Sequence, residues 1–306
     1  MNNILSYIRL YLQQVDKWVL LLCTTLSAIL IYMNYGHGLE NRLATLPLPF
    51  PNFTGHYILF FAAFTIPYVF YFIFKRVNYF RHPLFILLLL IAPAIFALKM
   101  SLNTSIFISD DDCWNHYWNQ VIYWPLRLLA ITGILLLLWR SFHKHQPFYG
   151  LSTKNFSWQP YVLMLALMIP LVAAASTQPD FLSAYPKLKI VMPLPAGAEN
   201  LSWFYKLLFE LSYGSDFFSI ELFFRGFLIL AFIKWTGKDA ILPMVCFYCT
   251  IHFGKPLGEC ISSYFGGLLL GIVIYHTRSI YGGLIVHLGI AWLMELGGYV
   301  GNYLFS

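Results

Sequence analysis

The stretch Asp216-Phe-Phe-Ser-Ile-Glu221-Leu-Phe-Phe-Arg225-Gly-Phe-Leu-Ile-Leu-Ala-Phe-Ile-Lys-Trp235 is largely apolar, yet it holds a glutamate and an arginine four residues apart. A run of this length crosses the hydrocarbon core of a bilayer as an α-helix, which takes about 20 residues. A charged side chain at the centre of such a helix costs about 2.5–3.5 kcal/mol on insertion scales. The stretch therefore predicts a membrane helix whose charges have a structural or chemical reason.

The composition of the whole chain is that of a membrane protein. Of the 306 residues, 59% are hydrophobic and 10% are charged, whereas soluble domains carry about 25% charged residues. The net charge of +6 comes from basic residues scattered in short loops. This pattern fits membrane topology and anionic lipid, and it argues against nucleic acid as a partner. The five cysteines give no disulfide framework, and Cys246 and Cys249 are expected to be buried thiols.

Other apolar runs of similar length predict an all-α polytopic membrane protein. The seventh run (239–252) and the eighth run (260–275) are short, so they are expected to be tilted, broken or partly re-entrant. The expected total is eight or nine transmembrane helices. An aromatic segment from Trp203 to Tyr213 is expected to form an interfacial helix before the sixth run. The predicted spans are 18–34, 56–74, 83–100, 119–139, 160–176, 216–235, 239–252, 260–275 and 281–301.

Basic residues in alternate loops predict the orientation of the chain. With the N-terminus inside, 11 Lys and Arg residues fall in inside segments and 6 fall outside, while Arg127 and Arg225 lie within spans. An inside N-terminus is therefore favoured. The chain carries no endoplasmic-reticulum retention signal, so we expect an integral protein of a bacterial cytoplasmic membrane.

Ionisable residues within the spans are concentrated in the last third of the chain, and Arg127 is the one clear exception before it. This contrast predicts two functional parts: residues 1–200 embed the protein in the membrane, and residues 201–306 carry a polar site. The concentrated residues are Glu221, Arg225, His252, His287 and Glu295.

Each of these residues has both a structural and a chemical interpretation. Glu221 and Arg225 are spaced i,i+4, so they share a helix face as an internal salt bridge or as parts of a catalytic site. His252 precedes a helix break at Gly254-Lys255-Pro256, where a single histidine is usually an interfacial hydrogen-bonding group. His287 lies inside the last span. Together, two imidazoles and a carboxylate are the groups that hold Zn²⁺ or polarise a water for amide hydrolysis.

The residues from Glu221 to His287 resemble the CAAX protease and bacteriocin-processing family of intramembrane proteases, which includes the type II CAAX prenyl endopeptidases. The family motifs are E-E-x-x-x-R, F-x-x-x-H and H-x-x-x-N. Here they correspond to Glu221 and Arg225, then Tyr248 to His252, then His287, in that order. The resemblance covers about residues 203–300 and implies the helical membrane fold of that family.

The resemblance also implies roles for these residues. In the family, the first glutamate and a histidine activate the attacking water, while the later histidine and the asparagine stabilise the oxyanion. This chain has Ile220 at the position of the first glutamate and Ala291 at the position of the asparagine. Two explanations of how the missing carboxylate is replaced stay open. Glu221 can serve if the helix is rotated, or Glu259 or Glu295 can supply the carboxylate, with Glu259 preferred because its loop can fold back toward His252.

Three functions fit this pattern. The first is an intramembrane endopeptidase, a metalloprotease or a glutamate-dependent protease, that cleaves membrane-associated peptides or proteins through Glu221, Arg225, His252, His287 and Glu259. The second is a catalytically inactive relative that binds membrane peptides or partners, which Ile220 and Ala291 favour. The third, a transporter with a Glu/His relay, ranks last because the chain shows no internal two-fold repeat.

Overall fold

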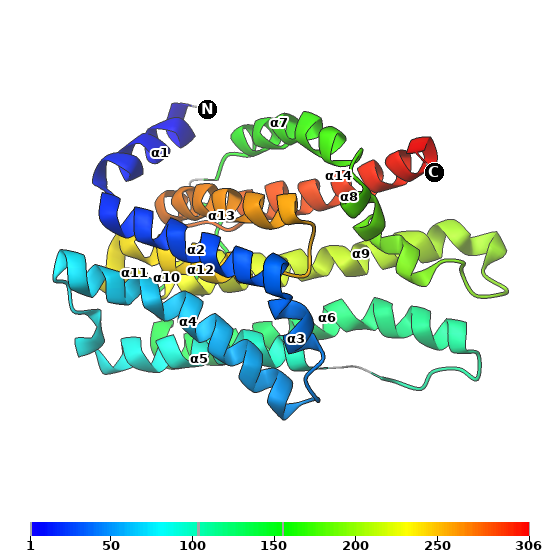
Figure 1. The fold of residues 1–306 in the computed structure, drawn as a ribbon, viewed down its shortest axis with the longest axis horizontal. Helices are drawn as coiled ribbons and strands as arrows, with labels where there is room; N and C mark the ends of the chain where they lie inside the picture. The colour runs from blue at the N-terminus through cyan, green and yellow to red at the C-terminus, as the bar shows by residue number, and fades with distance from the viewer. Residues whose placement is uncertain (1, 103–104, 155, 306) are drawn as a thin grey trace. The chain divides into compact units, whose positions relative to one another are not determined.

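The computed structural model describes residues 2–102, 105–154 and 156–305, and over these residues it contains helices and no strands. The chain is thus all-α, as expected from its apolar runs (Figure 1). The α-helices are α1 (Asn2–Gln14), α2 (Lys17–His37), α3 (Leu39–Ala44), α4 (Phe50–Lys75), α5 (Pro83–Ser101), α6 (Asp112–Leu138), α7 (Gln159–Ala175), α8 (Pro179–Ala184), α9 (Ser202–Ile220), α10 (Leu228–Leu230), α11 (Ile233–Thr236), α12 (Ile241–Thr250), α13 (Leu257–Thr277) and α14 (Tyr281–Phe305).

Short helical segments of other types join these elements. Two are π-helices, η2 (Trp139–His143) and η6 (Glu221–Phe227), in which the backbone bonds run from residue i to residue i+5. The others are 3₁₀ turns: η1 (Tyr79–Arg81), η3 (Phe148–Gly150), η4 (Lys187–Val191), η5 (Glu199–Leu201) and η7 (Gly237–Ala240).

Six helical stretches in the described part of the chain are long and apolar enough to cross a membrane: α2, α4, α5, α6 with η2, α13 and α14. At 1.5 Å per residue, the 19 residues of α5 already approach the ~30 Å hydrocarbon core. These helices coincide with predicted spans, so a polytopic helical membrane protein is confirmed. Helix α7 is apolar but has only 17 residues. The total of eight or nine crossings stays a prediction.

The predicted spans 216–235 and 239–252 take a different form. Helix α9 begins at Ser202 and continues through the predicted interfacial segment, and η6, α10 and α11 then follow in place of one straight helix. Helix α12 has ten residues, about 15 Å at the helical rise, and every one of them is buried. Irregular backbone is tolerated at membrane depth where protein covers it. The chain interrupts its helices here because neighbouring elements enclose them.

The chain divides into two compact units, each made of three stretches. The first unit comprises Met1–Leu102, Leu138–Phe156 and Leu222–Ile280. In it, α12 packs against α2, α4 and α13, and α4 lies beside α5 (Figure 1). The ring of Phe247 on α12 meets the rings of Phe60 on α4 and Phe224 at centroid distances of 4.9 and 5.1 Å. An aromatic core therefore fixes α12 within this unit.

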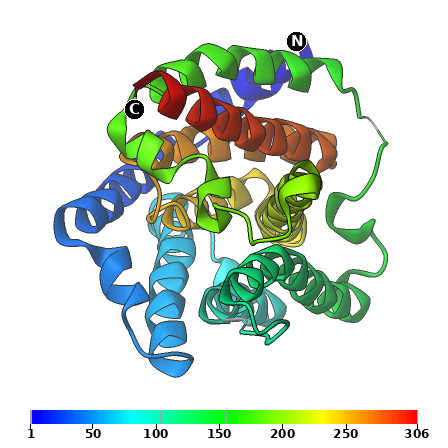
Figure 2. The ribbon, with the colours of Figure 1, turned by 90° about the vertical axis from the view of Figure 1, so that its right-hand side faces the viewer.

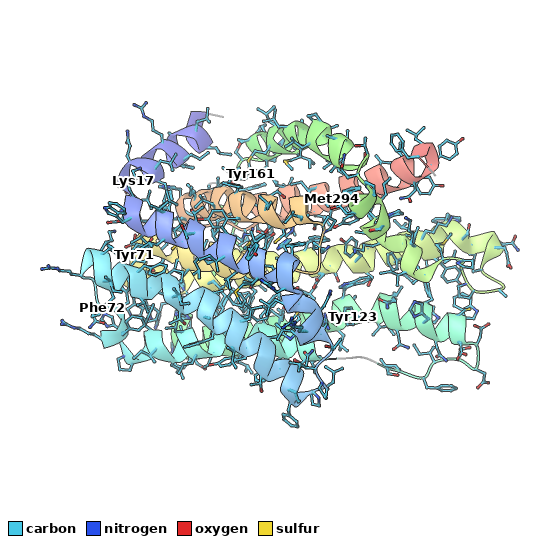
Figure 3. The ribbon with its side chains drawn as sticks, viewed as in Figure 1. Lys17, Tyr71, Phe72, Tyr123, Tyr161 and Met294 are labelled. Atoms are coloured by element: carbon cyan, nitrogen blue, oxygen red, sulfur yellow. The ribbon has the colours of Figure 1, made fainter. Side chains whose placement is uncertain are left out.

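The second unit comprises Asn103–Leu137, Ser157–Glu221 and Tyr281–Ser306. In it, α7 runs beside α14 (Figure 2). Figure 3 labels Tyr161 on α7 and Met294 on α14. At Gly282, a Cβ atom would lie 2.0 Å from Cζ of Tyr161, so the ring occupies the space that a side chain would need. On α9, a Cβ at Gly214 would lie 3.2 Å from Leu288. Glycines thus let α14 approach both of its neighbours. The division into a part that embeds the protein in the membrane (residues 1–200) and a part that carries the polar site (201–306) stays a prediction.

Candidate functional site

Glu221, which is buried, and His287, which is half-buried, form a pair in the second unit. Glu221 is the first residue of η6 and has no exposed surface, and His287 is the seventh residue of α14. Nδ1 of His287 donates a hydrogen bond to Oε1 of Glu221 over 2.9 Å. Because a carboxylate only accepts, the proton lies on Nδ1, and Nε2 is the nitrogen that can take up another proton. The structure therefore brings together two of the residues that the sequence singled out.

Apolar side chains hold this pair in place. Phe217, one turn before Glu221, meets the His287 ring edge to face with centroids 4.8 Å apart. Ala291, one turn after His287, is 3% exposed and belongs to the same apolar cluster as Phe217. Hydrogen bonds to charged groups strengthen in surroundings of low dielectric constant. The other buried members of the cluster are Tyr117, Val121, Trp124, Val191, Phe209 and Tyr213.

The π-helix η6 begins at the residue that faces His287. It replaces the α-helix that the i,i+4 spacing of Glu221 and Arg225 predicted. A π-turn holds an extra residue, so it rotates the following side chains relative to an α-helix, and such turns are frequent at functional sites. Ile220 is half-buried, whereas Glu221 is completely buried and contacts His287.

The π-turn is packed against a loop of the first unit. A Cβ at Gly226 would lie 2.5 Å from the carbonyl oxygen of Tyr149, so only glycine fits there. Tyr149 has a positive φ of 40°, a conformation that is rare for a residue with a side chain. The carbonyl of Gly150 next to it accepts a hydrogen bond from the backbone N–H of Ile280 over 3.0 Å. This loop contact fixes the backbone directly after Arg225.

Arg225 and His252 are both held by Tyr248 in the first unit. The Arg225 guanidinium is fully buried and lies 3.9 Å from the centroid of the Tyr248 ring, a cation–π contact. The same ring meets the His252 ring with centroids 4.6 Å apart. Nδ1 of His252 donates to the Tyr248 carbonyl over 3.0 Å, which leaves Nε2 as the nitrogen that can accept a proton. Tyr248 itself rests on Gly267, where a Cβ would lie 2.9 Å from its Cδ1.

Glu259 and Glu295, the two other carboxylates proposed as substitutes, each make contacts of their own. Glu259 is in the first turn of α13, with Oε1 3.5 Å from Nζ of Lys255. Glu295 accepts hydrogen bonds from the backbone N–H groups of Lys187 and Leu188, at 2.8 and 3.4 Å. These bonds attach the η4 segment to α14, which gives Glu295 a structural task in the second unit.

Glu210 is a partner of Glu295 that sequence reasoning missed. It lies on α9, outside the six candidate spans, and lines the same cavity as Glu295. Burial, followed by the charge of Glu295, raises the pKa of Glu210 to about 7. The two residues are far apart in the chain and belong to no common motif, so only the packing of α9 against α14 reveals the pair.

The residues predicted to hold Zn²⁺ were His252, His287 and Glu221. Over the residues that the structure describes, no three His, Cys, Asp or Glu side chains are placed to bind one metal ion. A structural or catalytic zinc site has at least three protein ligands. Binding of Zn²⁺ stays a prediction, and no chemical step is assigned to a metal.

Fold and site together define an integral membrane protein with a hydrogen-bonded carboxylate–imidazole pair. Residues 207–293 match the family model described as type II CAAX prenyl endopeptidase Rce1-like. The resemblance to the CAAX protease and bacteriocin-processing family that the sequence showed over about residues 203–300 is thus confirmed over residues 207–293. The matched segment contains Glu221, Arg225, His252, Glu259 and His287. No curated protein and no solved structure matches the chain.

Proposed function

We propose that this protein is an intramembrane endopeptidase that hydrolyses a peptide bond in a membrane-associated peptide or protein. The observation that carries the proposal is the hydrogen bond between the buried Glu221 and the half-buried His287. The family match supports the class of reaction, because it contains both residues. Membrane-associated peptides are the substrate class that this family implies.

The pair supplies the groups that hydrolysis requires. Glu221 holds the imidazole of His287 in one tautomer and stabilises its protonated form, as a carboxylate does in other hydrolytic sites. Nε2 of His287 takes a proton from water while the water oxygen attacks the peptide carbonyl carbon. The C–N bond then breaks, and the proton passes from Nε2 to the leaving amine. General base catalysis of this kind contributes about 10²–10⁴-fold to a rate.

The family resemblance supplies roles for the remaining site residues. His252 is proposed to assist in activating water, and Arg225 to provide positive charge, each positioned by Tyr248. Glu259 is kept as the second proposed carboxylate, paired with Lys255. These roles rest on the motifs and on the contacts within the first unit.

The test is cleavage of a membrane-peptide library by the full chain in nanodiscs. We expect Glu221→Gln and His287→Ala to lower the cleavage rate about 10²-fold or more while the protein stays folded. His276→Ala is the matched control, because His276 stacks on Tyr7 with centroids 4.5 Å apart and has no role in the proposed reaction. Cleavage that survives both His252→Ala and His287→Ala would contradict the proposal.

A catalytically inactive, peptide-binding relative is the second candidate function. It is favoured by Ala291, which places a methyl group in an apolar cluster where the family has asparagine. Loss of one oxyanion donor lowers rates by about 10²–10³-fold. A folded wild-type protein that binds membrane peptides and cleaves none of them would establish this second function. Metal analysis of the same preparation tests the prediction of Zn²⁺ separately.

A further inference from the structure

Two cysteines face each other where α12 and α13 meet. Cys249 is the last residue but one of α12, and Cys260 lies in the first turn of α13. The segment between them contains His252 and the helix break. Both cysteines are free thiols and both are buried. The pair therefore encloses a stretch of chain that the proposed function uses, although neither thiol takes part in that function.

Contacts between the two cysteines are reciprocal. The Cys249 thiol donates to the carbonyl of Cys260 over 3.8 Å, and the Cys260 thiol donates to the carbonyl of Cys249 over 3.9 Å. Each sulfur thus points toward the backbone of the other residue. A disulfide requires side chains that point toward each other in this way.

Glycines on α13 hold the two helices at this short separation. A Cβ at Gly267 would lie 2.9 Å from Cδ1 of Tyr248, and a Cβ at Gly271 would lie 2.8 Å from Cε of Met244. Gly267 is two helical turns after Cys260, so both residues lie on the α13 face that meets α12. The cysteine pair lies at one end of this close contact between α12 and α13, next to the segment that connects the two helices.

An apolar groove lies beside the start of α13. The groove has a volume of about 430 Å³ and lies between α2 and α13, with Tyr35, Leu257, Ile261 and Tyr264 among its lining residues. Ile261 follows Cys260 directly in the chain. Buried thiols are inert toward reagents that stay in water. The groove can take up a small oxidant that partitions into the membrane and hold it next to this part of α13.

We propose that Cys249 and Cys260 are a modification site, at which a membrane-permeant two-electron oxidant of the diazenedicarboxamide or quinone class forms a disulfide. The two S–H bonds break and one S–S bond forms. Two electrons and two protons pass to the oxidant, which becomes the hydrazine or the hydroquinone. The disulfide closes the segment that carries His252 and restricts its opening, so it stabilises the folded protein.

The test uses the full chain in nanodiscs with Cys113→Ser, which removes the exposed thiol and cross-linking between copies. The protein is treated with diamide, denatured and alkylated, and its peptides are mapped by mass spectrometry. We expect the number of alkylated thiols to fall from four to two, with the bridge between Cys249 and Cys260 and reversal by a phosphine. We also expect a higher unfolding temperature for the oxidised protein.

Single variants provide the matched controls. After treatment with the oxidant, the Cys249→Ser and Cys260→Ser proteins should each retain every remaining thiol. Their unfolding temperatures should not change. Cys23 and Cys246 form a second buried contact, with the Cys246 thiol 3.6 Å from the Cys23 carbonyl, so the double variant Cys23→Ser, Cys246→Ser should still form the bridge. Four alkylated thiols after oxidation, or a bridge only between Cys23 and Cys246, would overturn the proposal. The thiol count does not depend on proteolytic activity. A failure of the disulfide proposal would therefore not contradict the proposed function.

Discussion

Glu210 and Glu295 are two carboxyl groups that line the same cavity in the second unit. Two neighbouring carboxylates repel each other when both are ionised, and burial also disfavours the ionised form. Burial and the charge of Glu295 therefore both raise the pKa of Glu210. Glu295 also accepts hydrogen bonds from two backbone N–H groups of the η4 segment.

Stability should fall with rising pH because of Glu210. Its pKa is raised to about 7 in the folded protein from its ordinary value of 4.5. The folded state thus holds a proton between pH 4.5 and 7 that the unfolded state has released. The contribution of Glu210 is complete below pH 4.5 and is lost as the pH rises to 7. We expect Glu210→Gln to show a smaller decrease in unfolding temperature than wild type between pH 5 and 8.

Glu199→Gln is the control for this measurement. Glu199 is exposed, and backbone hydrogen bonds lower its pKa, so it does not titrate between pH 5 and 8. This variant should follow the wild-type curve. A Glu210→Gln protein whose unfolding temperature changes with pH as wild type does would show that Glu210 does not hold the proton.

Single residues of the site were predictable because charge is costly in an apolar run. Glu221, Arg225, His252 and His287 were recognised in this way and by their motif spacing. The contact between Glu221 and His287 was not, because it joins two helices that are 66 residues apart in the chain. The π-turn that begins at Glu221 and the packing of Gly226 against a loop carbonyl were not predictable either, since no local pattern reveals them.

Helix contacts in this protein depend on glycines that leave no space for a side chain. On α14, a Cβ at Gly298 would lie 2.6 Å from the backbone carbonyl carbon of Tyr185. Backbone atoms cannot rotate away as a flexible side chain can. Membrane helices commonly associate through small residues, because lipid provides little hydrophobic drive between them. We therefore expect the α14 contacts to be more sensitive to added volume than to lost apolar area.

Gly298→Ala should destabilise the folded protein by about 1–3 kcal/mol, the usual cost of overpacking. Gly266→Ala on α13 is the matched control, since no atom lies within 4 Å of its added Cβ. Alanine favours a helix over glycine by about 1 kcal/mol, so the control should be neutral or stabilising. Unfolding temperatures in the same detergent measure both effects. Equal losses in the two variants would contradict the contact argument.

At the scale of elements, seven of the predicted spans have a matching helix because length and apolar character alone define them. The segments 216–235 and 239–252 were predicted as continuous runs, and the chain instead forms η6, α10, α11 and a ten-residue α12. Their composition is apolar because protein surrounds them, and every residue of α12 is buried. Apolar sequence cannot distinguish burial in protein from burial in lipid.

Orientation is a property of the whole molecule that the charges of the loops predict. More Lys and Arg residues fall in the segments predicted to be inside than in those predicted to be outside. One residue on each predicted side of the membrane can be labelled to report the orientation of the chain. Cys113 is exposed at the start of α6, on the side predicted to be outside, and Lys144 is exposed after η2, on the side predicted to be inside.

We expect a membrane-impermeant maleimide to label Cys113 in intact bacterial cells that express the full chain. The four other cysteines are buried, so Cys113→Ser should abolish the label. In that background, Lys144→Cys should be labelled only after the membrane is permeabilised, because the segment carrying it faces the cytoplasm when the N-terminus does. The reverse pattern, with Lys144→Cys labelled in intact cells and Cys113 protected, would place the N-terminus outside. It would also show that the distribution of basic residues does not determine the topology of this chain.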